Sequence, residues 1–145
     1  MIRVVVDNAP IDVAAELPAL EGDGTGAVAS FTGLVRGDDG VTELALEHYP
    51  GMTERALHAI AGEAVSRWGL SAAVIVHRVG PMVPGDRIVF AAAAAPHRAA
   101  ALEACAFLID RLKTGAPFWK RERRGDDTRW VDARDSDDAA AARWG

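Results

Sequence analysis

The segment 112–122, "LKTGAPFWKRE", marks the passage from a helix to a strand. Apolar residues recur before it with helical spacing, at Leu102, Cys105, Ala106, Ile109 and Leu112. Gly115 and Pro117 are typical of a helix end, because glycine tolerates unusual backbone angles and proline cannot continue the hydrogen-bond pattern. Beyond them, Phe118 and Lys120 share one face of a predicted strand. The segment therefore predicts a helix and a strand joined by a bend.

The rest of the chain alternates between helical and strand patterns. Strands are predicted at 2–6, 26–36, 41–49, 72–80, 86–95, 118–122 and 128–133. Helices are predicted at 10–20, 53–68 and 96–115, with a short final helix capped by Ser136. Neighbouring strands are often joined by short turns, which favours antiparallel pairing. This order predicts an α+β fold with a mostly antiparallel sheet, in a single domain over 1–145.

A few residues predict where individual elements begin, bend or end. Thr53 is a candidate N-cap for the helix at 53–68, and Gly69 is a good stop for it. Gly33 predicts a bulge or bend within its strand. The alanine run at 91–95 is ambiguous, because alanine favours helix although its position favours strand.

Composition limits the class of protein. Half of the residues are hydrophobic and 26% are charged, which predicts a globular chain with a substantial core. Cys105 is the single cysteine, so an internal disulfide is excluded, and its apolar neighbours predict a buried structural thiol. The N-terminus lacks a signal-peptide pattern, and no apolar run reaches the roughly 18 residues of a membrane span. A cytoplasmic protein with no membrane partner is expected.

Charge is unevenly distributed along the chain. The net charge of −5 argues against a nucleic-acid partner, yet residues 111–124 carry six basic residues and one acidic residue. Such a basic segment on an acidic chain suggests a small anionic ligand or an acidic tail. A solvated basic surface patch remains the alternative interpretation.

Several common kinds of site are absent from the sequence. There is no phosphate-binding loop and no GxGxxG motif. The four histidines have no metal-like spacing with one another or with Cys105. We therefore expect neither a metal site nor a bound cofactor.

His97 and Arg98 are predicted to begin the long helix that ends near Lys113. Cations at a helix N-terminus oppose its dipole unless an anion binds there, so the pair predicts an anion site or else an exposed pair that tolerates the cost. Sixteen residues at 1.5 Å rise separate His97 from Lys113 by roughly 24 Å. One helix cannot bring both ends into one small pocket, so either the sites are separate, or an extended substrate or a second subunit connects them.

Lys113 and Lys120 are the only lysines, and the other fourteen basic residues are arginines. Arginine keeps its proton in proteins, whereas lysine can be tuned to exchange one, so the two lysines are candidates for acid–base chemistry. Each has a structural alternative: Lys113 can stabilise a helix C-terminus, and Lys120 can be a solvated residue on an edge strand.

Six segments in order resemble the large, catalytic subunit of molybdopterin synthase, the MoaE family. They are "FTGLVR" (31–36), "LEHYPGMTERAL" (46–57), "HRVGPMVPGD" (77–86), "PHRAAALEA" (96–104), "LKTGAPFWKRE" (112–122) and "RWVDARDSD" (129–137). The resemblance implies an α/β-hammerhead fold and a homodimer. It implies as partner a small ubiquitin-like sulfur-carrier subunit (MoaD-like) with a C-terminal Gly-Gly thiocarboxylate, giving a heterotetramer. Sulfur would pass from the carrier to cyclic pyranopterin monophosphate, without a metal, to form the dithiolene of molybdopterin.

The resemblance also assigns site residues by position. Lys113 and Lys120 match the catalytic lysines. The matched substrate-binding positions are Phe31, Leu34, Val35, Arg36, His97, Arg98, Arg121, Glu122 and Arg134. Gly115 departs from the family pattern, in which a larger, often basic residue is common. A dimeric module that binds a carrier tail or an anionic ligand without chemistry is the alternative function.

Overall fold

The computed structural model describes residues 1–131 and 135–145, and it contains two four-stranded sheets. The first sheet has the order β1-β4-β6-β2 and the second the order β5-β3-β7-β8. The strands of the first sheet are β1 (Ile2–Asp7), β2 (Ala27–Leu34), β4 (Ala72–Arg78) and β6 (Arg87–Ala95). Those of the second are β3 (Glu43–His48), β5 (Gly80–Met82), β7 (Phe118–Arg124) and β8 (Asp127–Val131). All recorded pairings are antiparallel except that of β1 with β4, so the predicted α+β class with mostly antiparallel strands is confirmed.

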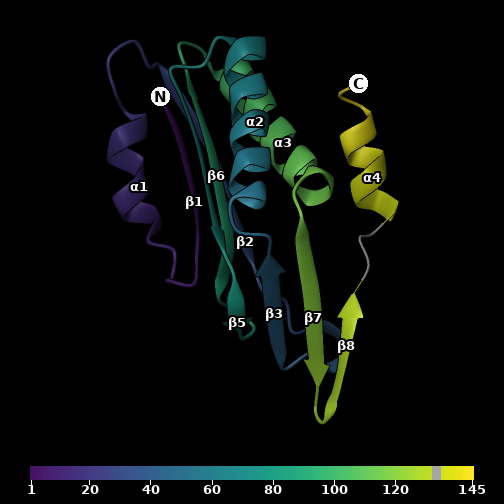
Figure 1. The fold of residues 1–145 in the computed structure, drawn as a ribbon. Helices are drawn as coiled ribbons and strands as arrows, with labels where there is room; N and C mark the ends of the chain where they lie inside the picture. The colour runs from purple at the N-terminus through teal and green to yellow at the C-terminus, as the bar shows by residue number, and fades with distance from the viewer. Residues whose placement is uncertain (132–134) are drawn as a thin grey trace.

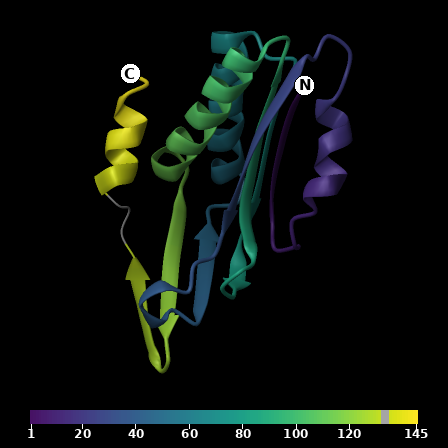
Figure 2. The same cartoon turned by 180° about the vertical axis from the view of Figure 1, so that it is seen from behind.

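Helices cover both faces of the first sheet. The helices in the described part of the chain are α1 (Val13–Leu20), α2 (Met52–Trp68), α3 (Arg98–Gly115) and α4 (Asp135–Ala142), with a short 3-10 turn at Asp38–Gly40. Figure 1 shows α1 on one side of this sheet and α2 with α3 on the other. Seen from behind, the second sheet extends beyond the C-terminal end of α3, and α4 lies beside that helix (Figure 2). The end of α3 therefore points to the place where the two sheets meet.

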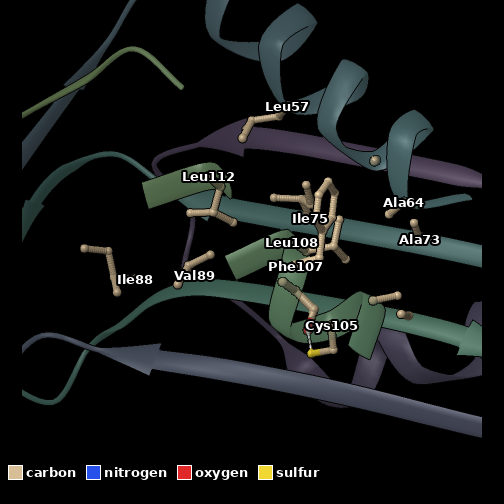
Figure 3. Packing of buried hydrophobic residues seen from close by; sticks show 14 of the residues in the cluster. Leu57, Ala64, Ala73, Ile75, Ile88, Val89, Cys105, Phe107, Leu108 and Leu112 are labelled. Carbon is tan, nitrogen blue, oxygen red and sulfur yellow. Dashed lines mark hydrogen bonds between the residues drawn. The ribbon is translucent and has the colours of Figure 1, made fainter. Parts of the chain in front are cut away.

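The core forms two layers because successive residues of a strand face opposite sides of a sheet. Val74, Val76 and Phe90 pack toward α1, whereas Ile75 and Val89 pack toward α2 and α3. In Figure 3, Leu57 of α2 and Leu108 and Leu112 of α3 converge on the second of these layers. The alanine run of β6 is wholly buried between the helices, where small side chains let helix and sheet approach closely.

Cys105 lies in this core, as the sequence predicts. Its side chain is 7% exposed, and its Sγ lies 3.7 Å from the carbonyl oxygen of Ala91. Burial raises the pKa of the Cys105 thiol to about 11, so the thiol stays protonated at neutral pH. The thiol is a packing group rather than a nucleophile.

Some local predictions are confirmed and others are wrong. Gly69 ends α2 in the left-handed conformation, and the β2–β6 register shifts after Gly33 as expected of a bulge. Thr53 is not the N-cap of α2: Gly51 takes that position, since the helix begins at Met52. The last helix begins at Asp135, so Ser136 is not its cap.

The strands resolve one ambiguity, confirm one prediction and add one element that was not predicted. The alanine run is a strand, because its burial between two layers outweighs the helical propensity of alanine. The half-buried strand predicted across 41–49 is confirmed at Glu43–His48: Leu44 and Leu46 are buried on one face, whereas Glu47 on the other is exposed. The short strand β5 was not predicted, because three residues carry too little periodicity.

Gly26 lets the chain enter β2 against the end of β6. A Cβ at this position would lie 2.1 Å from the carbonyl oxygen of Pro96, a backbone atom that cannot move aside cheaply. We expect Gly26→Ala to lower the free energy of unfolding by about 2 kcal/mol or more, in the range of overpacked sites. Gly22→Ala in the same loop is the matched control, because nothing lies within 4 Å of its Cβ position. Equal urea-unfolding midpoints for both variants would contradict this reading.

Candidate functional site

Lys113 and Lys120 are held on either side of the bend that the sequence predicts. Lys113 lies in the last turn of α3, which ends at Gly115, and Lys120 is the third residue of β7. Buried Thr53 fixes the bend: its hydroxyl donates to the carbonyl of Pro117 at 3.0 Å and accepts from the backbone N–H of Tyr49 at 2.9 Å. Thr53 therefore links α2 to the bend by a tertiary hydrogen bond and is not the helix cap.

The pairing of β7 with β3 sets the direction of Lys120. Lys120 lies opposite Leu46, and Phe118 lies opposite His48. Along β7 the half-buried residues alternate with exposed ones, so Lys120 shares a face with Phe118, as predicted. The opposite face carries Trp119 and other exposed residues.

Two adjoining cavities share Lys113, Lys120 and Ile88 in their walls. Most of the residues that line the first are apolar, and we call it the apolar cavity; its remaining lining residues are Leu46, His77, Val89, Leu112, Ala116, Phe118, Val131 and Asp137. The second is mainly polar and charged, and its other lining residues are Leu34, Val35, Arg36, Asp38, Val41, Leu44, Glu122 and Arg124. The two lysines therefore stand where an apolar compartment meets a charged one.

The charged cavity carries more positive than negative charge. Four cations and two carboxylates line it among the described residues. Glu122 accepts from Arg124 at 3.1 Å, and Asp38 lies 3.8 Å from Arg36. The excess of positive charge suits an anionic ligand.

His77 is the buried polar group of the apolar cavity. Its ring stacks on Phe118 with centroids 4.1 Å apart, and its Nδ1 lies 3.0 Å from the carbonyl oxygen of Arg78. Burial, with the positive charges of Lys113 and Lys120 adding to it, lowers the pKa of His77 to about 4, although the bond to the Arg78 carbonyl opposes the shift. The imidazole is therefore neutral at physiological pH.

The structure brings together some of the predicted site residues. Leu34, Val35, Arg36 and Glu122 line the charged cavity with both lysines. Phe31 lies on β2, an edge strand of its sheet, and its side chain is 41% exposed.

Other predicted residues lie apart from the lysines. His97 is the N-cap of α3 and Arg98 its first residue, so both are at the opposite end of that helix. Over 18 residues α3 spans about 27 Å, which agrees with the separation expected from sequence. Arg121 lies on the exposed face of β7 with its guanidinium 5.6 Å from the ring of Trp130. Arg134 lies outside the described residues.

Sequence reasoning missed four polar or charged residues that line the two cavities: His77, Asp38, Arg124 and Asp137. His77 falls within the quoted segment 77–86, but no local spacing ties it to the lysines 36 and 43 positions further on. Asp38 and Arg124 line the charged cavity from a turn and from the end of β7. The basic charge of 111–124 was the one available signal for Arg124, and only strand pairing shows that it faces the cavity.

The part of the chain that the structure describes, residues 1–131 and 135–145, offers no candidate for a metal site or a membrane span. No group of three or more histidine, cysteine, aspartate or glutamate side chains in this part of the chain is arranged to hold a metal ion. None of the described helices is long and apolar enough to cross a membrane.

Comparison with known proteins decides the family. The family model described as "MoaE protein" matches residues 6–115. The molybdopterin synthase catalytic subunit of Escherichia coli strain K12 is 51% identical over 146 aligned residues, covering 98% of this chain and 97% of the relative. The chain belongs to the MoaE family. The match runs from the end of β1 to the end of α3, so it includes Lys113 but stops short of β7 and Lys120.

Solved MoaE-family structures share the fold over nearly the whole chain. The molybdopterin cofactor biosynthesis protein E of Burkholderia multivorans has a TM-score of 0.87 and 52% identity, covering all of this chain and 97% of that one. The molybdopterin synthase structure from Staphylococcus aureus has a TM-score of 0.83 and 34% identity, covering 90% and 96%. The mixed α+β architecture described above is thus that of the MoaE family, and it includes β7 and the bend that holds the two lysines.

Proposed function

We propose that this chain is the catalytic subunit of a molybdopterin synthase. It transfers sulfur from the thiocarboxylate of a small ubiquitin-like carrier to cyclic pyranopterin monophosphate. The observation that carries the proposal is the place of Lys113 and Lys120, which come from different elements and line both of two adjoining cavities. Two groups able to exchange protons thus stand at a boundary where two reactants could meet.

The two cavities suggest that each lysine acts on a different reactant. A Gly-Gly tail, which has no side chains, suits the apolar cavity, where Lys113 meets its anionic acyl terminus and acts as acid and base. The pterin phosphate suits the charged cavity, where Arg36 can present parallel N–H donors and Lys120 assists proton transfer. Glu122 holds Arg124 at 3.1 Å and so keeps a second guanidinium in this wall.

The chemistry matches these residue types. The carrier sulfur attacks a substrate carbon and forms a C–S bond there, while a C–O bond of that carbon breaks and its oxygen leaves with the phosphate or, once protonated, as water. Carrier and substrate are then joined through an acyl–sulfur link. Water then cleaves the acyl–sulfur bond, leaving sulfur on the substrate and a carboxylate on the carrier. Each step moves a proton, and general acid–base residues typically contribute about 10²–10⁴-fold to such steps.

A homodimer can complete the site. His97 and Arg98 lie about 24 Å from Lys113 along one helix, so they reach the same substrate only from a partner subunit. We propose that residues 1–145 form one catalytic domain and that two copies of it associate with two carriers in a heterotetramer. Near the boundary between the two copies, Phe31, Arg121 and Arg134 contribute to the site. We propose that the protein acts in the cytoplasm.

Reconstitution tests the function. The purified chain is mixed with a thiocarboxylated carrier and cyclic pyranopterin monophosphate, and dithiolene formation is measured. We expect product that depends on all three components, with none when the carrier ends in an ordinary carboxylate. Tight binding of the carrier without product would favour the alternative, a non-catalytic dimeric module that binds a carrier tail or an anionic ligand.

A further inference from the structure

A tight turn at residues 83–86, which joins β5 to β6, takes no part in the chemistry proposed above (Figure 1). Pro84 and Gly85 are its two central residues, and Gly85 has a φ of +95°, in the positive region that a type II turn requires there. The backbone N–H of Asp86 donates to the carbonyl oxygen of Val83 at 3.0 Å and closes the turn. The sequence of the turn therefore suits the conformation that it adopts.

The carboxylate of Asp86 adds two further contacts to the 83–86 turn. Its Oδ2 accepts from the backbone N–H of Val83 at 2.9 Å, and the same atom lies 3.6 Å from the guanidinium of Arg78 on β4. The side chain of Arg78 is 17% exposed and that of Asp86 is 32% exposed, so water screens this ion pair less than it screens a fully exposed pair. One side chain thus braces the turn and links it to the first sheet.

The two chain neighbours of Arg36 both contact the 83–86 turn. The backbone N–H of Val35 donates to the carbonyl oxygen of Asp86 at 2.9 Å, and the carbonyl oxygen of Val35 accepts from the turn's glycine at 2.8 Å. On the other side of Arg36, Gly37 lies against the turn's proline, because a Cβ at Gly37 would be 3.3 Å from atoms of the proline ring. The turn therefore supports the backbone before and after Arg36.

The side chain of Arg36 needs this support because its own ion pair is weak. Arg36 lines the charged cavity, but its guanidinium lies 3.8 Å from Asp38, and the two side chains are 62% and 72% exposed. Exposed ion pairs of this kind do little to hold a side chain in one place. The backbone of residues 35–37 therefore sets where the guanidinium enters the cavity.

We propose that Asp86 is a positioning residue for anion binding: its carboxylate holds the 83–86 turn in place, and the turn holds Arg36 at the wall of the charged cavity. A site binds more tightly when its donors are already in place, because binding then bears less of the ordering cost. Asp86 is not among the residues that line the cavity, so it acts through Arg36. A role in turnover rests on the proposed function, whereas the effect on anion affinity does not.

The sign of the expected effect separates positioning from direct electrostatics. Removing a carboxylate near a cationic cavity would by charge alone strengthen the binding of an anion. If Asp86 positions Arg36, its removal weakens anion binding instead. A loss of affinity in a variant that has lost a negative charge is therefore the signature of the positioning role.

Two variants of Asp86 and one control variant test this role. Asp86→Ala removes both carboxylate contacts, whereas Asp86→Asn keeps an oxygen that can accept from Val83 and loses the charge opposite Arg78. Asp12→Ala is the control, because Asp12 also accepts a backbone N–H, that of Ala15 at 3.2 Å, at the start of α1. The control should lower stability without changing the charged cavity.

Inorganic phosphate is the probe, and its dissociation constant is measured by NMR titration of the full chain. We expect Asp86→Ala to weaken phosphate binding about tenfold and Asp86→Asn about threefold, with less than about a twofold change for Asp12→Ala. Amide hydrogen exchange of Val35 should be about tenfold faster in Asp86→Ala, because its acceptor lies in the loosened turn. In the reconstituted reaction, the KM for the pterin should rise while kcat stays within about twofold.

A double-mutant cycle shows whether Asp86 acts through Arg36. In an Arg36→Ala background, Asp86→Ala should change phosphate affinity by less than about twofold, because the group that it positions is gone. If Asp86→Ala does not fold, the threefold loss and the same cycle with Asp86→Asn decide.

Three results would overturn the proposal: a tenfold loss of affinity that persists without Arg36, unchanged phosphate affinity in the folded Asp86 variants, or a wild-type chain that binds no phosphate. Weaker phosphate binding in the variants, together with no dithiolene formation by the wild-type chain, would leave the positioning role standing and remove the proposed function. Normal turnover with unchanged phosphate affinity would do the reverse.

Discussion

Replacing either lysine by arginine is expected to reduce sulfur transfer at least about 100-fold, because arginine keeps the positive charge and loses the exchangeable proton. Lys113→Arg and Lys120→Arg would each be assayed with thiocarboxylated carrier under single-turnover conditions. Binding of carrier and of pterin should change far less than the rate, since the charge in both cavities is conserved.

Arg123→Lys is the matched control for these substitutions. It exchanges the same two residue types on the same strand, but Arg123 lies on the exposed face of β7, away from the cavities. We expect it to retain nearly normal activity. Near-normal rates for the lysine variants would instead show that charge alone suffices, and the proton-relay role would be lost.

Mixing two inactive variants is expected to restore activity. One variant carries Lys113→Ala with Lys120→Ala, and the other carries His97→Ala with Arg98→Ala. In a two-fold dimer each site would combine the lysines of one subunit with the helix N-terminus of its partner, so a mixed dimer has one intact site and one doubly defective site. Random exchange at equal amounts makes half of the dimers mixed, and activity should therefore recover to about a quarter of wild type.

Two controls make the complementation decisive. Exchange between differently tagged wild-type chains shows that mixed dimers form, and each inactive variant mixed with wild type sets the baseline. If the site belongs to one subunit, every site in the mixture retains a defect. No recovery despite proven exchange would then place His97 and Arg98 outside the reacting pocket.

Much of the local structure was predictable because local chemistry determines it. Gly69 ends α2 because its left-handed backbone favours glycine. Gly33 marks the bulge, where a Cβ would lie 2.8 Å from the side chain of Val89. Gly115 and Pro117 end α3, and the alternation after them predicts the face shared by Phe118 and Lys120. The apolar setting of Cys105 likewise predicts its burial.

Where long-range contacts outweigh local preference, the prediction failed or stayed open. The alanine run became a strand because a sheet neighbour and helices on both faces bury it. Thr53 caps nothing in α2 because its hydroxyl bonds to Pro117, 64 residues away. Neither contact can be recognised from a short segment of the sequence.

The sequence by itself determined that this chain belongs among α+β proteins, that its only two lysines flank a bend, and that one helix cannot unite His97 with Lys113. Only the tertiary structure decided that the two lysines share the walls of two cavities, that Arg124 faces one cavity, and that His77 lies in the other. The physical reason is that spacing along a chain fixes neighbours within one element, whereas strand pairing and helix packing fix neighbours from different elements.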